Sequence, residues 1–297
     1  MARMTVVGLG SMGMGMAQSL VRAGHAVSGF DVAPGRAEAL VAGGGVAATL
    51  AEAAAQSAVA VIVVLNAAQT ETVLYGPEGI APLMPKGGVI VSCATVSPEF
   101  ARDMATRAEA LGLMYLDAPI SGGAARAASG ELSIMASGSE AAFAAAKPAL
   151  DAMAAVVHDL GREIGSGSAM KAVNQLLAGS QIALMGEALA FALSQGLDLR
   201  QVYSVITQSA GNSWMFQNRA PHVLDADYRP LSAVNIWLKD LGIVKDIATG
   251  AGVPVPLVDT ALAQYRKAAE AGDGGLDDAA VTKVYTRAAG LKLPGEA

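Results

Sequence analysis

The chain has 297 residues, of which 53% are hydrophobic and 15% are charged. This composition excludes an intrinsically disordered chain, and the length suits one large or two ordinary domains. The formal net charge is −6 and lysines and arginines form no block, which argues against a nucleic-acid partner.

Cys93 is the only cysteine, so an intramolecular disulfide is excluded and a reducing compartment is favoured. The amino terminus shows no apolar signal segment, and we expect a cytoplasmic protein. The apolar run at 58–65 has only the length of a strand, and the run at 168–194 contains polar residues, so no membrane span is predicted. We also expect no metal site, because the histidines are scattered and no zinc-type spacing occurs.

The first half of the chain alternates strand-like and Ala-rich helical segments. Continuous apolar strands that alternate with helices are typical of a parallel sheet covered on both faces. The sequence therefore predicts an α/β domain over residues 1–164. The expected strands are Met4–Gly8, Ala26–Phe30, Val59–Leu65, Val89–Cys93, Met114–Asp117, Leu132–Ala136 and Val156–Asp159.

Strand signals stop after Gly165, and the pattern predicts an all-helical domain over residues 165–297. Its first helix, 168–194, would join the two domains, with Ser168 as N-cap and Gly196 as stop. The length and apolar content of this half favour a homodimer or homotetramer. The expected helices span 168–194, 198–209, 214–225, 233–250, 257–271 and 277–288.

The motif "GLGSMG" (Gly8, Leu9, Gly10, Ser11, Met12 and Gly13) directly follows the first strand and opens a helix. In this context G-x-G-x-x-G is the fingerprint of a Rossmann-type dinucleotide-binding domain, in which the helix N-terminus faces the pyrophosphate. Asp31 follows Gly13 by 18 residues, close to the expected ~20 for the acid that binds the ribose 2′-hydroxyl. NAD is therefore favoured over NADP, although Arg36 nearby leaves the strictness of that preference open.

The stretch "DAPISGG" places Ser121, Gly122 and Gly123 after a predicted strand. Successive small residues can turn several backbone N–H groups toward one anion, such as the carboxylate of a small acid. By itself, a Ser-Gly-Gly turn is at least as often a plain loop.

Lys171 is the only charged residue between Ile164 and Gly186, and Asn174 would share its helical face. A partly buried lysine is suited to proton transfer, because burial lowers its pKa toward neutrality. Taken alone, a lysine reaching the surface from an interface helix is the more common situation. The dinucleotide motif reverses that balance and favours Lys171 as the general acid/base. Lys239, followed by Asp240, would by itself indicate ordinary surface charge.

Together these motifs resemble those of the β-hydroxyacid dehydrogenase family, in the family's order and over almost the whole chain. The resemblance implies NAD-dependent oxidation of a small hydroxycarboxylate, with Lys171 as catalytic residue. It also implies that Ser121, Gly122, Gly123, Asn174 and Lys239 bind the substrate. The cofactor-binding set would be residues 8–13 of the glycine loop, Asp31, Leu65, Asn66, Thr95 and again Lys239.

Within the family, "VVLNAAQTETVL", "CATVSPE" and "SAVNIWLKDLGIV" look most similar to the branch that oxidises L-threonate. Two positions depart from common family patterns: Asn174-Gln175 stands where an Asn-Asn pair is frequent, and Arg126 stands where small residues are frequent. 3-Hydroxyisobutyrate and tartronate semialdehyde remain alternative substrates. A dinucleotide sensor without catalysis is the non-enzyme alternative, and a lone lysine on an uncharged helical run argues against it.

Overall fold

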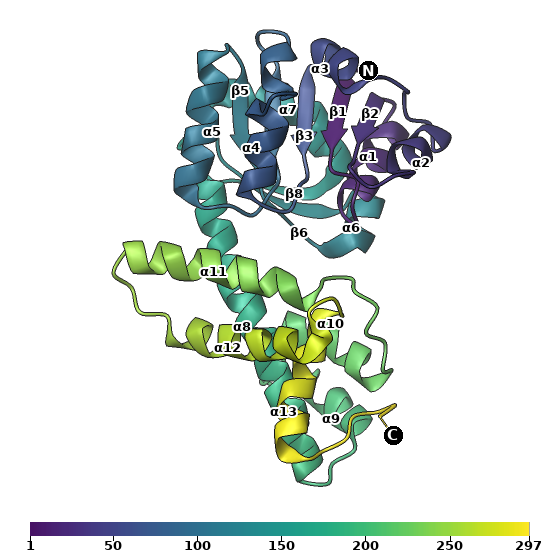
Figure 1. Cartoon of the computed structure of the whole chain (residues 1–297), viewed down its shortest axis with the longest axis vertical. Helices are drawn as coiled ribbons and strands as arrows, with labels where there is room; N and C mark the ends of the chain where they lie inside the picture. Colours follow the sequence, from purple (N-terminus) through teal and green to yellow (C-terminus); the bar gives the residue numbers. More distant parts are fainter. Residues whose placement is uncertain (297) are drawn as a thin grey trace. The chain divides into compact units, whose positions relative to one another are not determined.

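The computed structural model describes residues 1–296 and divides into two compact units, which we treat separately (Figure 1). Unit 1 comprises Met1–Lys171, and unit 2 runs from Ala172 onward. Helix α8 (Ser166–Ser194) contributes residues to both units. The predicted domain boundary at Gly165 stays a prediction, because α8 begins directly after it and the two units divide within that helix.

The main sheet of unit 1 has five parallel strands in the order β2-β1-β3-β4-β5 (Figure 1). Because β1 lies between β2 and β3, the chain moves to β2 on one side of it and then to β3 on the other. The carboxyl end of β1 therefore borders the point where the strand order reverses, which is where such sheets bind ligands. The strands are β1 Arg3–Val7, β2 Ala26–Phe30, β3 Val59–Ile62, β4 Val89–Ser92 and β5 Met114–Asp117.

Alternate strand residues pack against helices on opposite faces of this sheet. Val6, Val61 and Val91 join the core formed with α1 and α7, whereas Val7 and Ile62 join the core formed with α3, α4 and α5. This confirms the predicted doubly covered α/β fold. The helices are α1 Gly13–Arg22, α2 Arg36–Ala42, α3 Leu50–Gln56, α4 Ala67–Tyr75, the 3-10 turn Ala81–Leu83, α5 Pro98–Ala110, α6 Gly123–Ser129 and α7 Glu140–Met153.

A second, three-stranded sheet corrects the expectation of one wholly parallel sheet. It contains β6 (Ile120–Ser121), β7 (Leu132–Ala136) and β8 (Ala154–Asp159), and β6 pairs with β7 in the antiparallel sense. The two-residue β6 was not predicted, because so short a strand leaves no periodic pattern in the sequence. Its pairing with β7 holds the start of the Ser-Gly-Gly turn in place.

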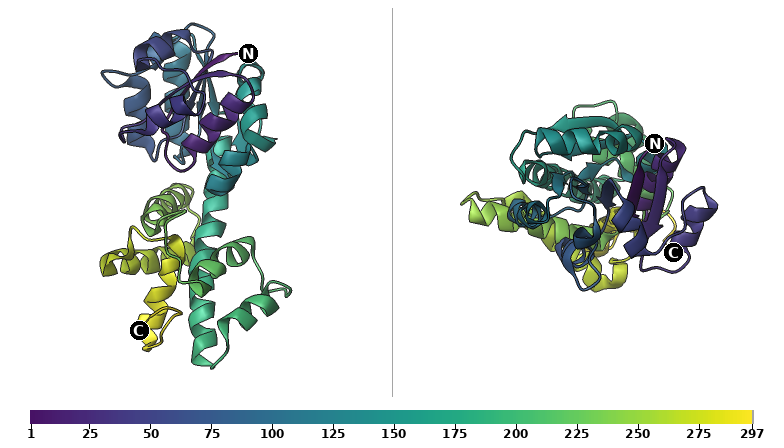
Figure 2. Two further views of the ribbon diagram at one scale, coloured as in Figure 1. Left: turned by 90° about the vertical axis from the view of Figure 1, so that its right-hand side faces the viewer. Right: turned by 90° about the horizontal axis from the view of Figure 1, so that it is seen from above.

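Unit 2 is helical throughout its described residues, as predicted. Helices α11 and α12 pack side by side (Figure 1; Figure 2 gives two further views), and Trp237 of α11 stacks on Tyr265 of α12 with ring centroids 5.9 Å apart. The Tyr265 hydroxyl donates to the Gly179 carbonyl of α8 at 2.9 Å. The elements are α9 Leu199–Ile206, α10 Trp214–Leu224, α11 Val234–Gly250, α12 Pro256–Ala268, the π segment Ala269–Asp273, the 3-10 turn Asp278–Val281 and α13 Thr282–Ala289.

Helix α8 has 29 residues and is long and apolar enough to cross a membrane by length and composition alone. Within its most apolar window 44% of the residues are buried inside the protein. Ile182, Met185 and Leu189 lie in the core of unit 2, so α8 has the character of a core helix. It begins at Ser166, two residues earlier than predicted, because Ser168 does not act as its N-cap.

Candidate active site

The glycine loop joins β1 to α1 in a conformation that depends on two of its glycines. Gly8 has φ +96°, and a Cβ at this position would lie 2.2 Å from the Val63 carbonyl oxygen. A Cβ at Gly13 would lie 1.8 Å from the carbonyl oxygen of Gly8. A Cβ at Gly10, by contrast, would meet no atom within 4 Å. Gly8 and Gly13 are thus required by the fold, whereas the space beside Gly10 fits the close approach of a dinucleotide pyrophosphate.

The predicted acid lies directly beside this loop. Asp31 follows β2, and its Oδ2 accepts a hydrogen bond from the Leu9 backbone N–H at 2.6 Å. Its other oxygen accepts from the Ala33 N–H at 2.8 Å. The carboxylate is therefore fixed at the carboxyl end of β2, beside the glycine loop, where a ribose hydroxyl of a nucleotide bound at that loop can donate to it. Arg36 is exposed at the start of α2.

The remaining predicted cofactor contacts follow the next two strands. Leu65 is exposed, and the Asn66 side chain caps α4 by accepting from the Gln69 N–H at 2.9 Å. Thr95 lies half-buried between β4 and α5. Carboxyl ends of parallel strands share one edge of the sheet, so these positions lie along the same edge as Gly8 and Asp31. Their contact with a cofactor stays a prediction.

Lys171 sits beside the predicted substrate loop. Its side chain is 7% exposed, and Nζ donates a hydrogen bond to the Ile120 carbonyl at 2.9 Å. The next residues are Ser121, Gly122 and Gly123, and the two glycines have φ of +137° and +78°. An amine thus lies beside the residue that precedes a turn of small residues within unit 1. That juxtaposition can hold a carboxylate and exchange a proton with a neighbouring hydroxyl.

A buried carboxylate that no sequence motif indicated fixes the start of α8. Asp117 accepts hydrogen bonds from the Gly165 N–H at 3.2 Å, the Ser168 N–H at 2.8 Å and the Ser168 hydroxyl at 2.7 Å. Burial raises the pKa of Asp117 despite these hydrogen bonds, which favour the ionised form. Gly167 comes so close to β5 that a Cβ there would lie 2.7 Å from the Asp117 carbonyl oxygen. An aspartate at the end of a predicted strand, followed later in the chain by a Gly-Ser-Gly-Ser helix start, is the sequence pattern that could have indicated this contact between Asp117 and α8.

Two other predicted residues lie in unit 2, within one hydrogen-bonded chain. Asn174 donates through Nδ2 to the Gln175 Oε1 at 2.8 Å, and Gln175 donates through Nε2 to Asp240. Lys239 forms an ion pair with the other oxygen of Asp240. Lys239 is therefore a paired residue and not an isolated surface charge.

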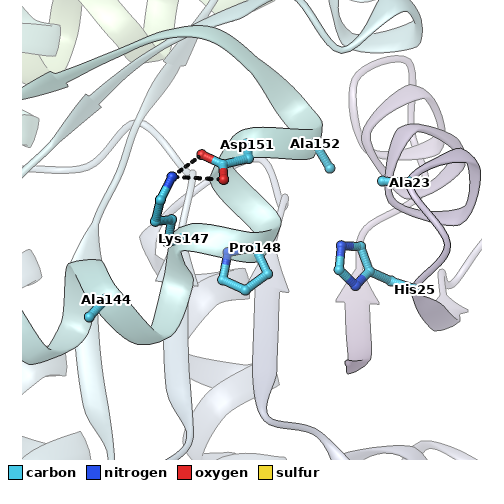
Figure 3. Close-up of a pocket in the computed structure, with 7 residues that line it drawn as sticks. All are labelled: Ala23, His25, Ala144, Lys147, Pro148, Asp151 and Ala152. Carbon is cyan, nitrogen blue, oxygen red and sulfur yellow. Dashed lines mark hydrogen bonds and ion pairs between the residues drawn. The ribbon is translucent and has the colours of Figure 1, made fainter. Parts of the chain in front are cut away.

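A surface pocket of about 430 Å³ lies elsewhere on unit 1 (Figure 3). His25 borders it at the amino end of β2, whereas Gly8 and Asp31 lie at the carboxyl ends of their strands. Lys147 and Asp151 form an ion pair in its wall. This pocket is thus at the opposite edge of the sheet from the candidate site.

Two protein-family models together match most of the chain. The sequence model of the NAD-binding domain of 6-phosphogluconate dehydrogenase matches residues 3–161. The model described as NAD-binding of NADP-dependent 3-hydroxyisobutyrate dehydrogenase matches residues 165–285. The chain belongs to the 3-hydroxyisobutyrate dehydrogenase-like family. The family match confirms the predicted family, the dehydrogenase class and the nicotinamide cofactor.

Curated and solved members of this family cover nearly the whole chain. The L-threonate dehydrogenase of Cupriavidus necator is 48% identical over 98% of both chains. The L-threonate dehydrogenase of Escherichia coli K12 is 44% identical over 98% of this chain and 96% of its own. A crystal structure from Salmonella typhimurium, described as 3-hydroxyisobutyrate dehydrogenase, is 47% identical with a TM-score of 0.90, covering 95% of this chain and 99% of its own.

Proposed function

We propose that this protein oxidises L-threonate to 2-dehydro-L-erythronate with NAD, and that Lys171 is its general acid/base. The observation that carries the proposal is the hydrogen bond from Lys171 Nζ to the Ile120 carbonyl, which sets a buried amine beside Ser121, Gly122 and Gly123. The L-threonate dehydrogenases that are 44–48% identical support the substrate. The Asp31 carboxylate supports NAD over NADP, because it would repel a ribose 2′-phosphate.

In this mechanism the Ser121 hydroxyl and the backbone N–H groups of Gly122 and Gly123 hold the substrate carboxylate. The substrate hydroxyl then faces Lys171. The neutral amine of Lys171 takes the hydroxyl proton as a hydride leaves the same carbon, and the carbon–oxygen bond becomes a carbonyl. The nicotinamide supplies the hydride acceptor when NAD is bound. In the reverse direction the Lys171 ammonium returns the proton.

Asn174 lies one helical turn beyond Lys171 on α8, and residues at that spacing share a helix face. We propose that its amide binds a substrate hydroxyl, and that Lys239 contributes to binding of substrate and cofactor. Arg126 packs its side chain near Gly122, where a Cβ would lie 3.0 Å from the Arg126 Cδ. This places a basic residue beside the turn and favours an acid as ligand.

3-Hydroxyisobutyrate is the second candidate substrate, because the Salmonella typhimurium structure at 47% identity carries that description. A panel of L-threonate, 3-hydroxyisobutyrate and tartronate semialdehyde, assayed at 340 nm with NAD(H) and NADP(H), distinguishes the candidates. L-Threonate with NAD should give the highest kcat/KM. Bound NAD without turnover of any acid would instead favour a dinucleotide sensor.

Lys171→Ala tests the mechanism. We expect kcat to fall by ~10²–10⁴, the usual contribution of general acid–base catalysis, while NADH affinity is retained. Lys147→Ala is the matched control, because that lysine forms an exposed ion pair with Asp151 and lies outside the site. Turnover near the wild-type level in Lys171→Ala would eliminate Lys171 as the acid/base.

We further propose a homo-oligomer, a dimer or tetramer, in the cytoplasm. Met170, Leu177, Leu184 and Phe191 are spaced by seven residues along α8 and are 44%, 52%, 62% and 67% exposed. A seven-residue apolar stripe of this kind favours packing against another helix. Sedimentation velocity at micromolar concentration should give a dimer or larger species, and a monomer would contradict the proposal.

A further inference from the structure

The hydrogen-bonded chain in unit 2 runs from Asn174 through Gln175 and the buried carboxylate of Asp240 to Lys239. Asp240 is 3% exposed and Gln175 is 7% exposed, so neither side chain relies on water for its hydrogen bonds. Lys239 donates to Asp240 Oδ1, and Gln175 Nε2 donates to Asp240 Oδ2. Asn174 and Lys239, the two ends of the chain, are only half-buried, so these are the members that a ligand can reach.

The direction of these hydrogen bonds is fixed by the chemistry of Asp240. An ionised carboxylate only accepts hydrogen bonds, whereas an amide has a donating and an accepting end. Because Asp240 accepts, Gln175 must turn its NH₂ toward it and its oxygen toward Asn174. The Asn174 NH₂ then donates to that oxygen at 2.8 Å. The Asn174 Oδ1 is consequently left for a ligand.

We propose that Asp240 and Gln175 are positioning residues that fix the Asn174 amide with its oxygen toward the substrate. This inference rests on the proposed function for the role of Asn174. An amide oxygen accepts a hydrogen bond from a hydroxyl, and it repels a carboxylate or carbonyl oxygen at the same place. We call the hydrogen-bonded chain Asp240–Gln175–Asn174 the relay. It therefore selects acids with a further hydroxyl group, such as L-threonate, over acids that lack this group.

Either link of the relay can be broken separately. Asp240→Asn keeps the shape of the side chain but offers Gln175 both a donor and an acceptor. The donor-to-acceptor direction of the hydrogen bonds is then no longer imposed on Gln175 and Asn174. Gln175→Met keeps a similar side-chain length and removes the connection altogether. Both variants should weaken the hold on Asn174 without altering the loop at Ser121 or the hydrogen bond of Lys171, which lie in unit 1.

The readout is the ratio of kcat/KM for L-threonate to kcat/KM for 2-hydroxybutanoate, which lacks both additional hydroxyls. We expect this ratio to fall by about tenfold in each variant, through a higher KM for L-threonate, which is the effect of about one lost hydrogen bond. The double variant should fall no further, because the two residues act in series. If the two residues had a purely structural role, kcat/KM would fall equally for both acids, and this result would overturn the proposal. Additive effects in the double variant would overturn it as well.

A second measurement does not depend on the substrate. The side-chain amide NMR signals of Asn174, identified by their loss in Asn174→Asp, should shift in both variants. Unchanged signals would overturn the relay even if L-threonate is the substrate. If the wild-type enzyme oxidises another hydroxy acid and not L-threonate, the proposed substrate is wrong, and the amide signals still decide on the relay. Should Asp240→Asn fail to fold, Gln175→Met gives the same two readouts.

Discussion

Replacing Asp117 by alanine should loosen the start of α8 and thereby displace Lys171. The Asp117 carboxylate accepts hydrogen bonds from two backbone N–H groups at this helix start, those of Gly165 and Ser168. Alanine leaves both groups buried without their acceptor. Lys171 follows Ser168 by three residues, so any shift of the first turn moves its side chain relative to Ile120.

The size of the effect follows from these contacts. A buried donor without a partner costs about 1–3 kcal/mol, so two of them cost about 2–6 kcal/mol. Removing the carboxylate also relieves the unfavourable burial that raises the pKa of Asp117. We therefore expect Asp117→Ala to destabilise the protein by about 3 kcal/mol. For a protein unit of this size that lowers Tm by roughly 6–12 °C.

Asp117→Asn is the matched control. Its amide oxygen can accept from the two backbone N–H groups, and its NH₂ can donate to the Ser168 hydroxyl, while the buried charge is gone. We expect a loss of about 1 kcal/mol or less, following the worth of a single hydrogen bond. Thermal unfolding followed by circular dichroism measures both variants, and kcat should fall by about 100-fold in Asp117→Ala, the scale of a misplaced catalytic group. Equal destabilisation by alanine and asparagine would refute the reasoning, since the charge and not the acceptor would then matter.

Two further predictions concern the glycine loop and acid stability. Gly13→Ala should destabilise the protein, because its Cβ would lie 1.8 Å from the Gly8 carbonyl oxygen, whereas Gly10→Ala should keep Tm and weaken NADH binding; equal Tm values for the two variants would contradict this. Burial raises the pKa of Asp277, but hydrogen bonds from His222 and nearby backbone N–H groups outweigh it and hold the pKa below its usual 3.8. Because the pKa of Asp277 is lower in the folded than in the unfolded state, its ionised carboxylate stabilises the folded protein above pH 3.8. This stabilisation is lost as the pH falls through the pKa of the folded state. The Tm advantage of wild type over Asp277→Asn should therefore shrink between pH 5 and pH 3, and a constant difference would contradict the assignment.

Local sequence patterns were sufficient for the two-part architecture and for the glycine loop, and they yielded the proposed catalytic residue. Gly8 and Gly13 could be identified because their spacing reflects backbone contacts within a few residues of the turn. Lys171 could be proposed as acid/base because the dinucleotide motif makes proton transfer a better explanation than a surface lysine for a single charge on an apolar helix. Asp31 could be identified because its position relative to the glycine loop is set by the length of one β-α-β unit.

Only the tertiary structure could reveal which groups these residues meet. Asp117 lies 51 residues before Ser168 and Gln175 lies 65 residues before Asp240, so neither hydrogen bond leaves a periodic signal in the sequence. The short strand β6, which places Ile120 beside Lys171, is defined by its pairing with β7 and not by its own composition. Local patterns depend on neighbours along the chain, whereas the orientation of Lys171 and Asn174 depends on partners that folding brings together.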